Sequence, residues 1–128
     1  MIVAGIGFRR SVAADEIVAL VELALDRASL ARDALGRLAT IAALAETPAF
    51  KEAARRLNVT AMPVTESALA AAAPHVRTQS ERSLAAHGVG SVAEAAALAA
   101  AGPDADLILE RIASASATCA LARLETRP

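Results

Sequence analysis

The chain has 128 residues, of which 55% are apolar and 21% are charged, and its formal net charge is −1. This length and hydrophobicity are typical of one folded domain spanning residues 1–128, and they exclude an intrinsically disordered chain. A near-neutral chain with two Phe and no Trp or Tyr has neither a bulk positive charge for nucleic acid or anionic lipid nor rings to stack on bases. We therefore expect no nucleic-acid partner and no membrane partner.

The sequence also carries few signals of export. Its single cysteine, Cys119, excludes an internal disulfide. No basic segment followed by an apolar stretch opens the sequence, and the uncharged residues 112–122 fall far short of the roughly 20 residues of a membrane span. We expect a cytoplasmic protein.

The N-terminal segment predicts a strand followed by a long helix. The apolar run Ile2-Val3-Ala4 predicts a buried strand that enters a glycine turn at Gly5-Ile6-Gly7. A helix is expected over about residues 13–29, because apolar residues recur there at helical spacing. Its apolar face consists of Ile17, Leu20, Val21, Ala24, Leu25 and Ala28.

The middle of the chain predicts two further strands with a helix between them. Residues 37–43 and residues 59–62 are the strands, and Pro63 is expected to stop the second of these. The helix begins at Thr47-Pro48, a capping residue before a proline at the first helical position, and is expected to end near Asn58.

The C-terminal half predicts helices and then a hairpin. Two short helices, residues 65–73 and 80–87, are followed by a helix that begins at Ser91 and ends at Gly102-Pro103. Ser91-Val92-Ala93-Glu94 matches a capping box, in which the serine hydroxyl accepts from the amide three residues on and the glutamate reaches back. Residues 107–112 and 117–122 predict two closing strands separated by four residues, hence an antiparallel hairpin.

This order of elements predicts an α/β fold. Alternating strands and helices favour parallel pairing with right-handed crossovers, and the terminal hairpin makes the sheet mixed. We expect a three-layer α/β/α domain with a five-stranded, mostly parallel sheet and helices on both faces.

Two segments are candidates for binding a ligand. Residues 5–11 join a strand to a helix, where glycine amides and the arginines Arg9 and Arg10 suit an anion. The segment lacks the third glycine of a dinucleotide motif and the Lys-Ser/Thr of a P-loop, so a tight turn with two solvated arginines is the alternative. Residues 88–94 form the second candidate, with a simple helix cap as the alternative.

The other reactive residues give weaker signals. Cys119 lies inside an apolar strand and is interpreted as a small buried hydrophobe. His75 and His87 have no second ligand at metal spacing. We expect no metal and no cofactor.

Four segments of the sequence, in this order, resemble the cobalamin-biosynthesis family that comprises stand-alone CobE and the C-terminal domain of CbiG. The resemblance covers residues 2–122, and its most specific part is residues 88–97. Departures from the family pattern are Phe8 and Ser11, where the family often has Cys and Gly. The four segments are Val3-Ala4-Gly5-Ile6-Gly7-Phe8-Arg9-Arg10, Leu38-Ala39-Thr40-Ile41, Gly88-Val89-Gly90-Ser91-Val92-Ala93-Glu94-Ala95-Ala96-Ala97 and Ala117-Thr118-Cys119-Ala120-Leu121-Ala122.

The resemblance implies a role in corrin-ring synthesis. CbiG proteins open a lactone on a cobalt-bearing corrin precursor and release a two-carbon fragment, using an N-terminal domain as well; CobE occurs alone. Precorrins are macrocycles ringed by acetate and propionate carboxylates. We expect an accessory protein that binds a precorrin or corrinoid acid as carrier or chaperone. The alternatives are a hydrolase of a precorrin-5 type lactone, with Glu94 or Thr118 handling the proton, and a structural subunit that docks onto another pathway enzyme.

We expect residues 5–11 and the start of the Ser91 helix to share one cleft at the carboxyl edge of the sheet. Adjacent residues of extended backbone point to opposite sides, so only one of Arg9 and Arg10 is expected to face the ligand. The expected ligand-binding residues are Gly5, Gly7, Arg9, Arg10, Ser11, Gly90, Ser91, Glu94 and Thr118.

Overall fold

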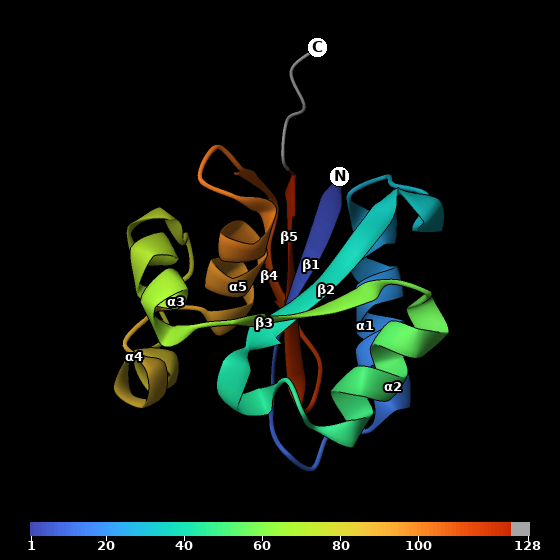
Figure 1. Cartoon of the computed structure of the whole chain (residues 1–128), viewed down its shortest axis with the longest axis horizontal. Coiled ribbons are helices and arrows are strands. Elements are labelled where there is room, and N and C mark those ends of the chain that lie inside the picture. Colours follow the sequence, from blue (N-terminus) through green and yellow to red (C-terminus); the bar gives the residue numbers. More distant parts are fainter. Residues whose placement is uncertain (124–128) are drawn as a thin grey trace.

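Five strands form one mixed sheet in the order β3-β2-β1-β5-β4 (Figure 1). The structure is a computed structural model that describes residues 1–123, apart from the side chain of His87. Strands β1, β2 and β3 are parallel, whereas β5 is antiparallel to both β1 and β4. The expected mixed sheet with a C-terminal hairpin is confirmed. The strands are β1 (Ile2–Phe8), β2 (Leu35–Ile41), β3 (Thr60–Val64), β4 (Asp106–Ala113) and β5 (Ala117–Arg123).

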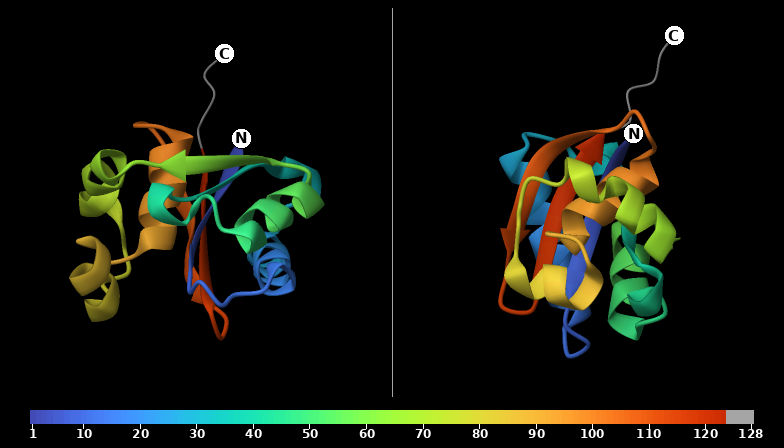
Figure 2. Two further views of the ribbon diagram at one scale, coloured as in Figure 1. Left: turned by 60° about the horizontal axis from the view of Figure 1, so that its bottom comes forward. Right: turned by 90° about the vertical axis from the view of Figure 1, so that its left-hand side faces the viewer.

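Helices cover both faces of this sheet (Figure 2). Helices α1 (Ala14–Arg27) and α2 (Pro48–Leu57) pack on one face through their apolar stripes. Helix α5 (Val92–Ala101) lies against the other face, and α3 (Glu66–Ala72) packs on α5. The α1 and α2 stripes are buried as their spacing predicts, and Asn58 ends α2 in the left-handed conformation. The three-layer architecture is therefore confirmed.

Helix α4 (Glu81–His87) differs from the others in its exposure. Its described residues are exposed except for Ser83, which is half-buried. Ser80 caps the helix through its hydroxyl, and Gly88 ends it with a φ of 73°. The short helix lies at the lower left of the molecule in Figure 1, and its residues approach the carboxyl end of β1.

The expected glycine turn is wrong, because Gly5 and Gly7 lie inside β1. Gly5 pairs with Ala39 and Ala120 on the two neighbouring strands, and Gly7 pairs with Thr118. A Cβ atom at Gly5 would lie 2.0 Å from the carbonyl oxygen of Ala93. Gly5 therefore lets α5 approach the central strand closely, and the chain leaves the sheet only at Arg9.

The sequence predicted that Pro63 would end the third strand. In the structure Pro63 lies within β3, opposite Thr40. β3 is one of the two edge strands of the sheet, and β2 is its one neighbour among the described strands. Proline is tolerated in such a strand because one side of its backbone needs no partner.

Candidate functional site

A cavity of about 450 Å³ opens at the carboxyl end of β1. Its walls come from the end of β1, the first turn of α5, helix α4, the outer part of β4 and the β4–β5 turn. The expectation that the segment after β1 and the start of the Ser91 helix share one cleft is confirmed, since Gly7, Arg9 and Ser91 all line it. We call it the β1-end cavity.

Three arginines from three separate elements line the β1-end cavity. Arg9 follows β1, Arg82 lies on α4, and Arg111 lies on β4. The described lining residues include no Asp or Glu. Within residues 1–123, none of these three guanidinium groups forms an ion pair. The cavity therefore concentrates positive charge in a chain whose net charge is −1.

The sequence indicated only one of these three arginines. Arg9 lines the cavity and Arg10 does not. That only one of the adjacent pair faces a ligand stays a prediction. Arg82 and Arg111 lie in no motif, and they reach the cavity only because α4 and β4 fold back toward β1. No pattern along the chain marks them.

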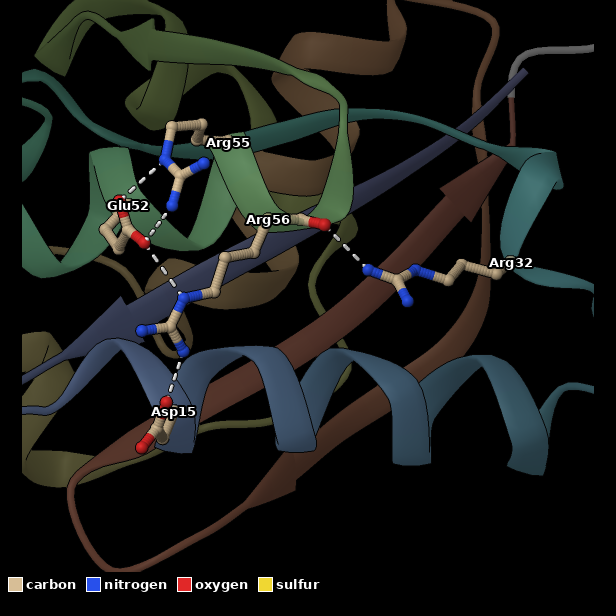
Figure 3. A network of polar contacts seen from close by, with 5 residues as sticks. All are labelled: Asp15, Arg32, Glu52, Arg55 and Arg56. Carbon is tan, nitrogen blue, oxygen red and sulfur yellow. Dashed lines mark hydrogen bonds and ion pairs between the residues drawn. The ribbon is translucent and has the colours of Figure 1, made fainter.

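Four arginines outside the cavity, Arg32, Arg55, Arg56 and Arg77, form ion pairs with acidic residues, and the network between α1 and α2 is an example (Figure 3). Arg56 donates to Asp15 and Glu52, and Arg55 donates to Glu52. Hydrogen bonds from Arg55 and Arg56 lower the pKa of Glu52 to about 2. Within residues 1–123, Arg10, Arg27, Arg37 and Arg123 also form no ion pair. The feature that distinguishes Arg9, Arg82 and Arg111 is that all three line one cavity without an acidic residue in its described lining.

Hydroxyl groups supply most of the remaining polar lining. The Ser83 hydroxyl is buried and has no hydrogen-bond partner among the described residues. The Ser91 oxygen accepts from the amide of Glu94 at 3.1 Å, and its proton has no acceptor among the described residues. Thr118 donates to the carbonyl of Gly7 at 3.3 Å. The hydroxyl residues of the lining are Ser80, Ser83, Ser91, Ser114, Ser116 and Thr118.

Apolar residues complete the lining. Val92 supplies an apolar wall from the first turn of α5. Phe8 is also a lining residue, but its ring packs on the α1 and α2 face of the sheet, where it stacks on Phe50 with ring centroids 5.9 Å apart. The cavity thus combines cationic groups, hydroxyls and apolar surface.

Only one of the two hydrogen bonds of the predicted capping box forms at the start of α5. The Ser91 hydroxyl accepts from the Glu94 amide as predicted, but the Glu94 carboxylate does not reach back to Ser91. It accepts instead from the amides of Arg77, Thr78 and Arg111 and from the Thr78 hydroxyl. Spacing within one helix cannot reveal this role, because the donors are about 16 residues away on either side.

The β4–β5 turn at the mouth of the cavity is held by α1. Glu16 accepts from the Ser114 hydroxyl and, at 2.6 Å, from the Ser116 amide. These hydrogen bonds lower the pKa of Glu16. The Arg9 amide in turn donates to the Ser116 carbonyl at 2.9 Å, which joins the turn to the chain just after β1.

The structure divides the nine expected ligand-binding residues into two groups. Gly7, Arg9, Ser91 and Thr118 line the cavity. Gly5 lies beneath α5, and a Cβ at Gly90 would lie 2.4 Å from the Thr78 carbonyl oxygen, so both glycines permit close packing. The residues outside the described lining are Gly5, Arg10, Ser11, Gly90 and Glu94.

Cys119 and His75 belong to no metal-type cluster among the described residues. Cys119 is buried, as expected, and burial raises the pKa of its thiol to about 12. Among the described residues, no three His, Cys, Asp or Glu side chains gather as a metal site. No helix within residues 1–123 has the length and apolarity needed to cross a membrane.

Comparison with known proteins identifies the family. Residues 2–122 match the family described as cobalamin synthesis G C-terminus. The chain belongs to this family. It is also 41% identical over 121 residues to protein CobE of Sinorhizobium sp, an alignment that covers 94% of this chain and 79% of that protein.

Solved structures agree with this assignment to the CobE/CbiG family. The crystal structure of CobE, a protein from the cobalamin (vitamin B12) biosynthetic pathway, superposes on this chain with a TM-score of 0.92 and 33% sequence identity. The match covers 100% of this chain and 93% of the CobE chain. Cobalamin biosynthesis protein ChiG from Agrobacterium tumefaciens matches with a TM-score of 0.78 and 34% identity, over 98% of this chain and 100% of that one. The chain is thus a cobalamin-biosynthesis protein of the CobE/CbiG family.

Proposed function

We propose that this protein binds a polycarboxylated corrin-ring intermediate in the β1-end cavity and carries or shields it without changing it. The observation that supports this most directly is the set of three arginines, from β1, α4 and β4, around an apolar wall with no acidic residue among the described lining. Arginine presents a planar fork that matches a carboxylate. Because the chain belongs to a cobalamin-biosynthesis family, we take the carboxylates of the ligand to be those at the periphery of a corrin ring.

The shape of the cavity fits one edge of such a ligand. A volume of about 450 Å³ lies within the range of small-molecule sites but is too small for a whole substituted macrocycle. Val92 offers contact to the apolar ring, while the arginines reach peripheral carboxylates. A ligand held by one edge can be passed on, which suits a carrier.

The geometry favours binding over hydrolysis. A hydrolase needs a base close to a nucleophile or a water. The Thr118 hydroxyl donates to the carbonyl of Gly7. The Glu94 carboxylate accepts from four donors, and Glu94 itself is not among the lining residues. The lactone-hydrolase and docking-subunit alternatives have no specific observation in their favour.

Absorbance titration with hydrogenobyrinic acid tests the proposal. We expect a saturable spectral shift at one ligand per chain, with no new product. Arg9→Ala should weaken binding about three- to tenfold, as expected for an exposed arginine–carboxylate contact. Arg10→Ala is the matched control, because its side chain lies next in sequence but outside the lining, and it should leave the affinity unchanged. Absence of binding, or equal effects of the two substitutions, would refute the proposal; appearance of a product would replace it with the hydrolase.

A further inference from the structure

We infer that Glu94 is a positioning residue that sets the places of Arg82 and Arg111 in the β1-end cavity; the inference rests on the proposed function. Glu94 is fully buried, with 0% of its surface exposed. Every other residue of α5 is Val, Ala or Leu, so this is the one charged group of the helix. A buried charge is costly unless it is fully hydrogen-bonded, and an apolar residue here would suit the helix better.

The carboxylate joins two segments that are far apart in sequence. Its Oε1 atom accepts from the amides of Arg77 and Thr78 at 2.6 and 3.0 Å. Its Oε2 atom accepts from the Thr78 hydroxyl at 2.5 Å and from the amide of Arg111 at 2.9 Å. A single carboxylate therefore binds two segments: residues 77–78, which precede α4, and Arg111 near the C-terminal end of β4.

Each of these two segments carries a cavity arginine. Arg111 is held at its own backbone amide. Arg82 lies four residues after Thr78, on a helix whose described residues are mostly exposed. Besides Glu94, the segment before α4 is tied by the hydrogen bond from the Ser80 amide to the Gly90 carbonyl at 2.8 Å. With so little packing of its own, α4 depends on these ties for its position.

The negative charge itself is needed for this arrangement. All four partners are donors, and a carboxylate can accept every one of them. Glutamine has the same shape, but its amide nitrogen is a donor and would face another donor at one of the two positions. Glu94→Gln should therefore release either the Thr78 side or the Arg111 side while keeping the volume of the core.

The experiment compares Glu94→Gln with Thr40→Val in the hydrogenobyrinic acid titration. Thr40 is also fully buried, and its hydroxyl donates to the Ile6 carbonyl at 2.7 Å, but it lies outside the cavity lining. At a temperature where circular dichroism shows both variants folded, we expect Glu94→Gln to bind at least tenfold more weakly than wild type. The salt dependence of its affinity should also be shallower, because fewer arginines reach the ligand. Thr40→Val should keep both the affinity and the salt dependence of wild type.

Hydrogen exchange adds a readout at the residues concerned. The amides of Arg77, Thr78 and Arg111 should exchange faster in Glu94→Gln and not in Thr40→Val. If Glu94→Gln fails to fold, Thr78→Val takes its place; it removes one of the four donors and should cause a smaller loss of affinity in the same direction. Binding by folded Glu94→Gln, or failing that by Thr78→Val, with wild-type affinity and salt dependence overturns the inference alone. Absence of binding by wild type overturns the proposed function and this inference with it.

Discussion

Arg111 and Arg82 extend the cationic character of the cavity beyond Arg9. Arg111 is half-buried, whereas Arg82 is exposed, so a carboxylate bound to Arg111 is better sheltered from water. We predict that Arg111→Ala weakens binding of hydrogenobyrinic acid about tenfold, or about 1.4 kcal/mol, and that Arg82→Ala has a smaller effect. Arg123→Ala is the control, because Arg123 is exposed at the far end of β5. Isothermal titration of the three variants measures this, and an equal loss in Arg123→Ala would contradict it.

Gly5 determines how closely α5 packs on the sheet. A Cβ atom there would meet the Ala93 carbonyl oxygen at 2.0 Å and the Ala97 amide nitrogen at 2.5 Å, both of which are backbone atoms that cannot rotate away. We predict that Gly5→Ala lowers the free energy of unfolding by about 3 kcal/mol. Gly7→Ala should cost less, since its Cβ would meet the Thr118 hydroxyl at 2.8 Å, which is on a movable side chain. Urea denaturation measures both, and the reverse order of costs would contradict the packing role of Gly5.

The carboxylate of Glu94 makes the stability of the fold depend on acid pH. Burial raises the pKa of Glu94, but hydrogen bonds from Thr78, Arg111 and Arg77 outweigh burial and hold the pKa below its ordinary value of 4.5. A carboxylate with a lowered folded-state pKa contributes stability above its unfolded-state pKa and loses this contribution as the pH falls through the folded-state pKa. We predict that wild type loses stability progressively below pH 4.5. Glu94→Gln should lose less over that interval.

Urea midpoints at a series of acidic pH values measure this difference. Glu16 and Glu52, whose pKa values are also lowered, are present in both proteins and contribute alike. The difference between the two curves therefore reports Glu94. Parallel curves for wild type and Glu94→Gln would contradict the prediction.

At the scale of elements, α1 holds the β4–β5 turn in place through Glu16. The Ser116 amide donates to Glu16, and the Ser116 carbonyl accepts from the amide of Arg9. We predict that Glu16→Ala speeds hydrogen exchange at the Ser116 amide severalfold and weakens corrinoid binding modestly. Asp26→Ala, an exposed change on the same helix, should do neither. Unchanged exchange at Ser116 in Glu16→Ala would show that the turn holds its shape without α1.

The elements that sequence predicts well are those whose signals are local. Helix α2 begins at Pro48, buries Phe50 and ends at Asn58 as its spacing and caps indicate. The β4–β5 hairpin follows in the same way from two apolar runs with a short gap. The turn predicted at Gly5-Ile6-Gly7 was wrong because Gly5 allows close packing of α5, which follows some 90 residues later. No local pattern distinguishes a glycine needed for close packing from a glycine in a turn.

Residues of the candidate site could be predicted from the sequence only where they lie in a recognisable local motif. Arg9 and Ser91 lie in motifs at strand and helix ends, and the fold brings both to the β1-end cavity. Arg82 and Arg111 depend on tertiary contacts that the sequence does not encode locally. The role of Glu94 is similar, because its partners lie in two other segments.

At the scale of the whole molecule, the position of the cavity follows from the strand order. β1 is the central strand, with a parallel neighbour on one side and an antiparallel neighbour on the other. The chain leaves β1 toward α1 on one face, while α5 packs on the opposite face. Elements of the two faces therefore diverge at the carboxyl end of β1, where open α/β sheets commonly bind ligands.

The overall charge of the chain supports one further prediction about ligand choice. With a net charge of −1, the protein does not attract a polyanion as a whole, so we expect the attraction to come from the three arginines at the cavity. An amide has no charge and cannot replace a carboxylate against an unpaired guanidinium. We predict that a corrinoid with free peripheral carboxylic acids binds at least tenfold more tightly than the same macrocycle with those acids converted to primary amides.

Competition between the two forms, measured by absorbance at low and at high salt, tests this. High salt should narrow the difference, because it screens the exposed arginines. Equal affinities at low salt would mean that the ring, and not its carboxylates, is what the cavity recognises.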